Sequence, residues 1–277
     1  MNPATLDDAY NNRKADPDWD ATFARLKAAS AAVYRDVAAS RDLAYGPLPR
    51  ERFDWLPCGT PNAAVFIFIH GGYWQSSTKD DFALCARGPL ACGFDVVLAE
   101  YTLAPDASMT QIVEEIAALL DFLAASEGAA STRGRKVILS GHSAGGQLTA
   151  VHRNHPSVAY ALPISGLFDL APLAQTYLND KLHLTRNEIE DFSPLRHVIA
   201  GTPMTVSVGA SELPELVRQS REYADACAKV DARVNYLEVP GRTHFTMCDD
   251  LADPHGVQMP ALMQALSQNM SPARGPQ

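Results

Sequence analysis

The sequence has few cysteines, no long apolar run and no excess of positive charge. Its five cysteines are scattered over 277 residues without a Cys-x-x-Cys pair, which argues against disulfides and zinc and predicts reduced thiols. No apolar stretch is long enough to span a bilayer. The formal net charge of −9, from 23 Lys and Arg against 32 Asp and Glu, disfavours nucleic acids and anionic membranes as partners.

The first residues also lack a basic region followed by an apolar core, so we expect no signal peptide and a cytoplasmic protein. A composition of 47% hydrophobic and 20% charged residues is sufficient for a large core, and the length fits a single domain over 1–277. We find no internal repeat. Only the tail at 271–277 is expected to be disordered.

Strand and helix patterns alternate along the chain. After an N-terminal helical segment within 1–45, whose helix is expected over 19–38, the predicted strands are 52–56, 65–70, 95–101, 137–142, 161–165, 205–208 and 234–239. The predicted helices between them are 80–92, 110–126, 144–154, 215–229 and 257–269. This alternation predicts an α/β fold with a mostly parallel, doubly wound sheet and helices on both faces. The first strand or two could run antiparallel, and a site is expected at the carboxyl ends of the strands.

One motif stands between a predicted strand and a predicted helix. From Lys136 the chain reads Lys-Val-Ile-Leu-Ser-Gly-His-Ser-Ala-Gly-Gly, which places Ser143 in a Gly-x-Ser-x-Gly sequence. In a nucleophile elbow the turn holds the serine in a strained conformation with its hydroxyl exposed above the sheet, and Gly141 and Gly145 leave room for the tight approach. Ser143 is therefore the candidate nucleophile.

A second motif follows the buried strand at 65–69 and reads His70-Gly-Gly-Tyr-Trp. In acyl transfer, preorganised backbone N–H groups stabilise the oxyanion by about 3–4 kcal/mol per donor. We expect these donors to be the N–H groups of Gly72, Tyr73 and Ala144. His70 is expected to be structural.

A nucleophilic serine needs a base, which should come from a loop after a late strand. His244 lies in such a loop, directly after the predicted strand at 234–239, and His255 is a poorer candidate that stays open. The carboxylate that orients the base is expected between serine and histidine in chain order. Glu212 fits, because it follows the strand at 205–208, whereas Glu215 after Pro214 suits a first helical turn but is close enough to compete.

Other acidic and thiol groups lie near the expected base. Asp249 and Asp250 follow the histidine and are expected to be solvated loop charges. Cys248, four residues beyond His244, is a candidate to lie near the site, although a buried structural role is the simpler expectation.

The order Ser143, Glu212, His244 together with the His-Gly-Gly loop resembles α/β-hydrolases of the hormone-sensitive-lipase and esterase type. His70-Gly-Gly-Tyr-Trp-Gln is similar to the kynurenine formamidase (arylformamidase) branch. Similar stretches extend over most of the chain: 9–13 (Ala-Tyr-Asn-Asn-Arg), 165–170 (Ser-Gly-Leu-Phe-Asp-Leu), 214–216 (Pro-Glu-Leu) and 218–220 (Arg-Gln-Ser). Members of this branch often carry Asp where this chain has Glu212, and either carboxylate can accept the imidazole hydrogen bond.

A polar segment from 169 to 197 is too long for a plain connection and predicts a small cap, bounded at about 169–200. Together with the N-terminal helix it would enclose the acyl and leaving-group pockets. Four aromatic residues besides Tyr73 are candidates to line the pocket: Trp74, Phe168, Tyr177 and Phe245. Trp74 and Phe168 are the two we favour.

The resemblance implies an arylformamidase that cleaves a small acyl group from an aromatic amine, with N-formylkynurenine as the leading substrate. A general short-chain carboxylesterase is the alternative, since both reactions pass through the same acyl-enzyme. A catalytically inactive relative that binds a ligand or partner protein is disfavoured by the intact set of groups. This mechanism needs no metal or organic cofactor. The expected partner is a small aromatic amide or ester, and the sequence leaves open whether the chain forms a homodimer.

Overall fold

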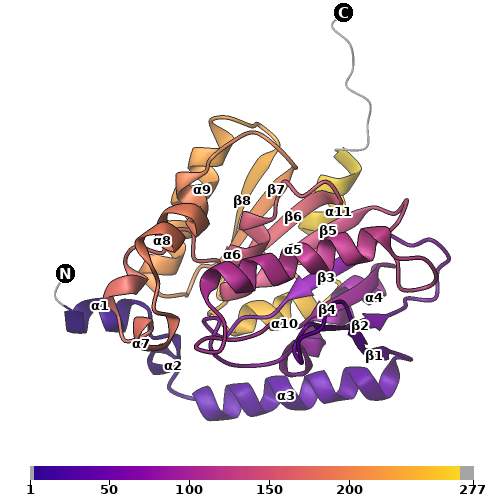
Figure 1. The fold of residues 1–277 in the computed structure, drawn as a ribbon, viewed down its shortest axis with the longest axis horizontal. Helices are drawn as coiled ribbons and strands as arrows, with labels where there is room; N and C mark the ends of the chain where they lie inside the picture. The colour runs from indigo at the N-terminus through magenta and orange to yellow at the C-terminus, as the bar shows by residue number, and fades with distance from the viewer. Residues whose placement is uncertain (1–2, 269–277) are drawn as a thin grey trace, which may run out of the picture.

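The computed structural model describes residues 3–268, so the tail predicted at 271–277 lies outside the described residues. Their strands form one sheet in the order β1-β2-β4-β3-β5-β6-β7-β8 (Figure 1). The strands are β1 (Ser40–Ala44), β2 (Arg52–Leu56), β3 (Val65–Ile69), β4 (Asp95–Ala99), β5 (Val137–His142), β6 (Val158–Ile164), β7 (Met204–Gly209) and β8 (Val234–Val239). β1 and β2 pair antiparallel with each other and β2 pairs antiparallel with β4, while all later pairs are parallel. The predicted α/β fold with a mostly parallel sheet is confirmed.

Helices cover both faces of the sheet (Figure 1). The helices before β5 are α1 (Pro3–Ala9), α2 (Asn12–Ala15), α3 (Trp19–Asp36), the 3-10 helix η1 (Lys79–Ala86), α4 (Arg87–Ala91) and α5 (Met109–Ala125). Those after β5 are α6 (Ala144–Val151), η2 (Leu173–Gln175), α7 (Asn179–Leu182), α8 (Arg186–Phe192), η3 (Pro194–Arg196), α9 (Pro214–Ala228), α10 (Thr246–Ala252) and α11 (Gln258–Gln268).

Alternate side chains of the central strands define two halves of the core. Ile67 and Ile69 of β3 pack in a cluster with buried residues of α5 and α6. Phe66 and Phe68, which point to the opposite face, pack with buried residues of α3, η1, α10 and α11. Since every residue of β3 is buried, the strand reads as a continuous apolar run, as expected for the centre of a parallel sheet.

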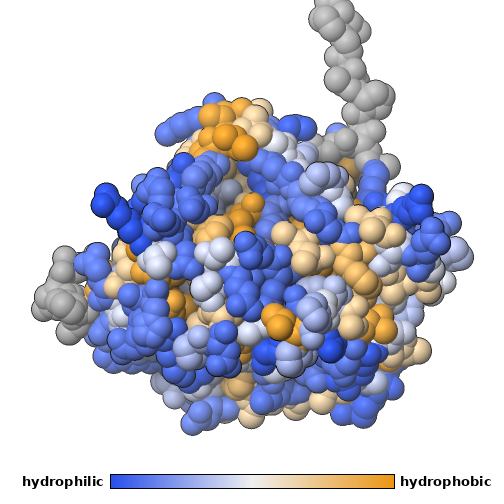
Figure 2. All heavy atoms as spheres, in the orientation of Figure 1, coloured by the Kyte–Doolittle hydropathy of each residue, from blue (hydrophilic) through white to orange (hydrophobic). Residues whose placement is uncertain are grey.

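The outer surface carries both hydrophilic and apolar side chains. In the view of Figure 2 hydrophilic residues are interspersed with several small apolar groups, one of which lies over the turn between α9 and β8, where Val230 is 50% exposed. Within residues 3–268, no helix has the length and apolar character needed to cross a membrane.

Three elements differ from the sequence expectation. Residues 40–44, expected within the helical N-terminal segment, form the edge strand β1, whose mostly exposed side chains give no alternating pattern. The predicted helix at 80–92 divides into η1 and α4. The helix α10 was not predicted.

Asp250, expected to be solvated, is instead 1% exposed. Its carboxylate accepts hydrogen bonds from the backbone N–H groups of Val257 and Gln258 at the start of α11. It therefore serves as a buried cap for that helix.

The segment predicted as a cap contains η2, α7, α8 and η3, and it packs beside the N-terminal helices (Figure 1). The N–H of Tyr177 donates to Asp7 Oδ1 at 2.9 Å. Gln75 Nε2 donates to the carbonyl of Leu178 at 2.7 Å, which ties the segment to the loop after β3. The segment at 169–200 thus contacts both the N-terminal helices and the loop after β3, each more than 100 residues away in the sequence, above the carboxyl ends of the strands.

Candidate active site

The turn between β5 and α6 has the geometry of a nucleophile elbow. Ser143 has φ 58° and ψ −116°, a conformation that non-glycine residues rarely adopt, and its N–H donates to the carbonyl of Ile164 at 2.9 Å. A side chain at Gly145 would collide with the carbonyl oxygen of Ile69, so the close approach of α6 to β3 requires glycine there. The strain holds the Ser143 side chain at the amino end of α6, at the wall of a cavity.

His244 and Glu212 come from the loops after β8 and β7, and the parallel pairing of these strands brings the loops together. His244 Nδ1 lies 2.7 Å from Glu212 Oε2. The other carboxylate oxygen, Oε1, accepts from Ser165 Oγ at 2.5 Å and from the N–H of Gly209 at 2.7 Å. The Glu212 side chain is 0% exposed, and its donors among residues 3–268 follow or end three neighbouring strands, β6, β7 and β8.

The electrostatics of this pair favour an ionised acid. Burial opposes ionisation of Glu212, but His244, Ser165 and the Gly209 N–H outweigh it and hold the pKa of the carboxyl below its usual value. An ionised Glu212 only accepts hydrogen bonds, so His244 Nδ1 carries the proton of this bond and Nε2 is left with a free lone pair.

Glu215, the competing carboxylate, is engaged elsewhere. Its Oε2 lies 2.8 Å from Arg218 Nη2 and accepts a hydrogen bond from the Tyr10 hydroxyl at 3.2 Å. It stands in the first turn of α9, next to Pro214. The structure therefore brings Glu212, and not Glu215, to the histidine.

A second imidazole packs against the first. His142 Nε2 donates to the carbonyl of His244 at 2.8 Å, and the two ring centroids are 4.4 Å apart. Burial, and after it the charge of His142, lower the pKa of His244, while Glu212 opposes the shift. The pKa of His142 is raised, because Cys248 and Glu212 outweigh the effect of its burial. His244 thus stays neutral, and able to accept a proton, at a lower pH than an ordinary histidine.

The loop after β3 presents unused backbone donors to the same cavity. Gly72 has φ 107° and Tyr73 has φ 51°, and a side chain at Gly72 would collide with the carbonyl of Ser76. Among the hydrogen bonds of residues 3–268, none uses the N–H of Gly72, Tyr73 or Ala144. The loop is also fixed from outside: the Tyr73 hydroxyl donates to the carbonyl of Tyr10 at 2.5 Å and accepts from Asn12 Nδ2 at 3.1 Å.

His70 has the structural role expected of it. It is fully buried, its Nε2 lies 3.0 Å from Glu100 Oε1, and its ring stacks on Tyr101 with centroids 4.5 Å apart. Arg50 approaches the same carboxylate oxygen at 2.6 Å. This cluster holds the start of the loop in place and leaves no ring nitrogen for chemistry, since His70 Nδ1 lies 2.8 Å from the carbonyl of Gly71.

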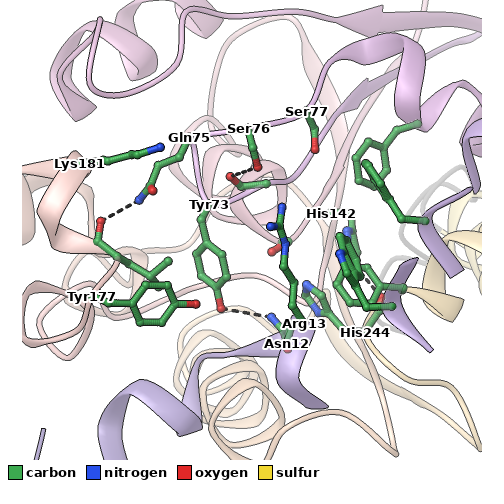
Figure 3. A pocket seen from close by; sticks show the side chains of 17 residues that line it. Asn12, Arg13, Tyr73, Gln75, Ser76, Ser77, His142, Tyr177, Lys181 and His244 are labelled. Carbon is green, nitrogen blue, oxygen red and sulfur yellow. Dashed lines mark hydrogen bonds between the residues drawn. The ribbon is translucent and has the colours of Figure 1, made fainter. Parts of the chain in front are cut away.

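A cavity of about 250 Å³ lies over Ser143 and His244. It is small beside the roughly 300–1,000 Å³ of typical ligand pockets, so it suits a compact substrate. Figure 3 shows Tyr73, Tyr177, Arg13 and His244 around it. Five aromatic side chains besides Tyr73 contribute to its wall: Trp19, Phe23, Phe82, Tyr177 and Phe245. No hydrogen bond among the described residues joins the Ser143 hydroxyl to His244, so that contact would tighten when a substrate binds.

Two of the four predicted pocket aromatics do line this cavity, namely Tyr177 and Phe245. The two favoured from the sequence, Trp74 and Phe168, do not line the cavity. Trp74 and Phe168 are both 0% exposed and belong to the core, where Phe168 stacks on Tyr223 with centroids 4.5 Å apart. Trp74 lies in the same apolar cluster as β3 and α5. The closeness of an aromatic residue to a site motif in the sequence therefore does not show whether its side chain lies in the core or lines the pocket.

Several lining residues were not predicted from the sequence. They come from the N-terminal helices and the cap segment: Asn12, Arg13, Trp19, Phe23, Leu178 and Lys181. The N-terminal helix and the segment at 169–200 were expected from the sequence to enclose the pocket, and the stretch at 9–13 is similar to the arylformamidase branch, but no pattern singled out these side chains. Within residues 3–268, no group of three or more His, Cys, Asp or Glu is arranged to hold a metal ion.

Comparison with known proteins adds three findings. A family profile described as alpha/beta hydrolase fold matches residues 66–247. The kynurenine formamidase of Danio rerio is 28% identical over 248 residues, which cover 82% of each chain. That of Drosophila melanogaster is 27% identical over 212 residues and 70% of each chain.

Two solved structures of other proteins have folds similar to that of this chain. A protein provisionally described as a thioesterase, from a Silicibacter species, superposes with a TM-score of 0.82 at 27% identity, covering 93% of this chain and 98% of its own. An esterase from Pyrobaculum calidifontis gives a TM-score of 0.71 at 16% identity, covering 91% of this chain and 94% of its own. The second likeness concerns the fold alone.

Proposed function

Because the chain belongs to the α/β-hydrolase fold family, we propose that it is a serine hydrolase that removes a small acyl group from an aromatic amine. The observation that carries the proposal is the 2.7 Å bond between Glu212 and His244 beside Ser143 in a strained turn. These three groups have the roles of acid, base and nucleophile in acyl transfer.

The first half of the reaction follows from the tautomer of the base. His244 Nε2, whose lone pair is free, takes the proton of Ser143 as the hydroxyl oxygen attacks the substrate carbonyl. Glu212 stabilises the imidazolium that forms. The unused N–H groups of Gly72, Tyr73 and Ala144 donate to the oxyanion of the tetrahedral intermediate. His244 then protonates the leaving amine, and an acyl-enzyme remains on Ser143.

In the second half, water attacks the acyl-enzyme and gives its proton to the same imidazole. The bond from the acyl carbon to Ser143 Oγ then breaks, His244 returns the proton to Ser143 and the carboxylic acid leaves. An arylamine leaves more readily than an alkylamine, so a formylated aromatic amine suits these groups. Esters pass through the same acyl-enzyme, and some carboxylesterase activity is expected from the same residues. Neither half of the reaction requires a cofactor.

Two observations support an arylformamidase in particular. The relatives named kynurenine formamidases align over 70–82% of the chain. The cavity is small and five aromatic side chains besides Tyr73 line it. N-formylkynurenine is the leading candidate substrate.

All five cysteines are free thiols, which agrees with the proposed cytoplasmic location.

Two measurements test the proposal. A fluorophosphonate probe should label Ser143 in the wild-type protein, and a folded protein that never labels would exclude the serine-hydrolase mechanism. A substrate panel of N-formylkynurenine, acylated anilines and p-nitrophenyl esters then separates the two activities. Fast cleavage of long aliphatic esters without cleavage of any aryl amide would replace the arylformamidase by a carboxylesterase.

A further inference from the structure

The wall of the cavity is positively charged although the chain as a whole is acidic. Among the 17 residues that line it, Arg13 and Lys181 are cationic, and no Asp or Glu is present. The chain has a formal net charge of −9. Since Asp and Glu outnumber Lys and Arg in the chain, a wall of random composition would contain more carboxylates than cations. The presence of two cations and no carboxylate therefore indicates that the cavity accepts an anionic group.

Neither cation has a carboxylate partner within the part of the chain that the structure describes. The ion pairs of residues 3–268 include those of neighbouring cations, such as Lys14 with Asp8 at 2.6 Å, but none of Arg13 or Lys181. The nearby carboxylate of Asp7 accepts the N–H of Tyr177. Both cations line one cavity, so an anion that enters it is attracted by both.

Arg13 is placed by an aromatic stack. Its guanidinium lies 4.9 Å from the ring centroid of Trp19, and the Trp19 ring lies 4.4 Å from that of Phe245, the residue after His244. A cation over an indole face is held in position while its N–H groups stay free. The planar guanidinium can bind a carboxylate through two parallel hydrogen bonds.

Lys181 reaches the cavity from α7 in the cap segment. Figure 3 shows it near Gln75, while Arg13 rises from the N-terminal segment between Tyr73 and His142. The hydrogen bond from Gln75 to Leu178 fixes this part of the cap to the loop after β3. The two cations therefore come from two separate segments of the wall, Arg13 from α2 and Lys181 from α7.

We propose that Arg13 and Lys181 form an anion subsite that binds a carboxylate on the leaving-group part of the substrate. The assignment to the leaving group rests on the proposed function, because the acyl group must sit at Ser143 and the oxyanion donors. The chemical class that results is an N-acyl arylamine that carries a carboxylate. Neutral anilides and neutral esters would be cleaved by the same groups without using this subsite.

Binding of product-like ligands tests the subsite without any need for turnover. Isothermal titration calorimetry on the purified full chain compares 2-aminobenzoate with its neutral isostere 2-aminobenzamide. We expect 2-aminobenzoate to bind about fivefold or more tightly, with an advantage that falls as salt is added, because both cations are exposed. Equal affinity for the two ligands in low salt would overturn the proposal.

Variants identify the residues. Arg13→Gln and Lys181→Gln should each remove most of the advantage of 2-aminobenzoate, whereas Arg13→Lys should keep part of it. Lys14→Gln is the matched control, since it removes the same charge from the same helix at a residue that does not line the cavity. A loss in Lys14→Gln equal to that in Arg13→Gln would reduce the effect to net charge and overturn the assignment. Melting temperatures close to that of the wild type show that the variants are folded.

Kinetics separates this proposal from the one it rests on. In Arg13→Gln, kcat/KM for N-formylkynurenine should fall through KM about fivefold or more further than kcat/KM for p-nitrophenyl acetate. If the wild type cleaves neither substrate, the serine-hydrolase function fails, and the calorimetric comparison still decides the subsite. Equal losses for both substrates in Arg13→Gln would overturn the subsite and leave the hydrolase intact.

Discussion

The inner and outer halves of the cavity are built differently. The inner half is built on Ser143 and His244, with Glu212 bound to His244 behind the cavity wall, and all three are less than 9% exposed. They follow the parallel strands β5, β7 and β8 of one sheet. The outer half comes from α2, α3 and the segment at 177–181, and it includes exposed side chains such as Tyr177 at 43%. Backbone pairing of the sheet fixes the inner half, whereas side-chain contacts between distant segments assemble the outer half.

This difference assigns separate tasks to the two halves. Acyl transfer needs groups held within fractions of an ångström, which the buried strand ends provide. Choice of leaving group needs only a wall of suitable shape and charge, and that wall can vary without disturbing the sheet. Changes in the inner half should therefore lower kcat for every substrate, and changes in the outer half should alter the ranking of substrates.

The largest expected effect is that of Ser143→Ala. Turnover of all substrates should fall by roughly 10⁶-fold, as for a nucleophile in a unit of this kind. The fold should persist, because the Ser143 hydroxyl makes no hydrogen bond among the described residues. Steady-state kinetics and a thermal melt check both statements. Near wild-type turnover of any single substrate would move the nucleophile elsewhere.

The second effect concerns the acid. Glu212→Gln should lower kcat by roughly 10⁴-fold, because a neutral amide neither stabilises the imidazolium nor fixes its tautomer. Glu215→Gln removes a comparable charge three residues away, where it pairs with Arg218, and should change kcat no more than a few-fold. The pair of kinetic measurements is decisive, since the opposite order would assign the role to Glu215.

Acyl chain length should show how closed the inner half is. In a cavity of about 250 Å³, formyl and acetyl substrates should exceed butyryl ones by at least about tenfold in kcat/KM. Each misfitted methylene costs roughly 1–3 kcal/mol of transition-state binding. A series of p-nitrophenyl esters of increasing length measures this, and a flat series would mean that the acyl side is open.

The smallest effect is a shift in pH dependence. Burial and His142 lower the pKa of His244, so the acidic limb of kcat/KM should lie below the usual histidine value of about 6.5. His142→Gln keeps a donor for the His244 carbonyl but removes the charge, so the pKa of His244 should rise and the limb should move to higher pH. A limb that stays in place or moves to lower pH would contradict the role of His142.

The sequence predicted the parts of the site that depend on local patterns. A strand, a tight turn and a helix around Ser143 are contiguous, and His244 follows a strand directly, so short segments contain the signal. Glu212 and Glu215 could not be separated in this way, because the choice depends on which side chain reaches a loop 32 residues away. Most strands and helices were predicted to within a few residues for the same local reason.

The remaining features depend on tertiary contacts. Trp74 and Tyr73 are adjacent and both have positive φ, yet only Tyr73 lines the cavity. Asp250 is a polar residue in a polar stretch, and its burial follows from the path of α11. Arg13 and Lys181 are separated by more than 160 residues, and no pattern in either segment indicates the other.

The hydrogen bonds of the Tyr73 hydroxyl to Tyr10 and Asn12 have a practical consequence for handling the protein. They join the loop that carries the proposed oxyanion donors to Tyr10, directly after α1, and to Asn12 in α2, beside the segment at 169–200 (Figure 1). Proteolytic trimming of this segment would remove both partners of the Tyr73 hydroxyl and loosen that loop. Purification handles for kinetic work therefore belong after α11, on the opposite side of the molecule from the segment at 169–200 (Figure 1).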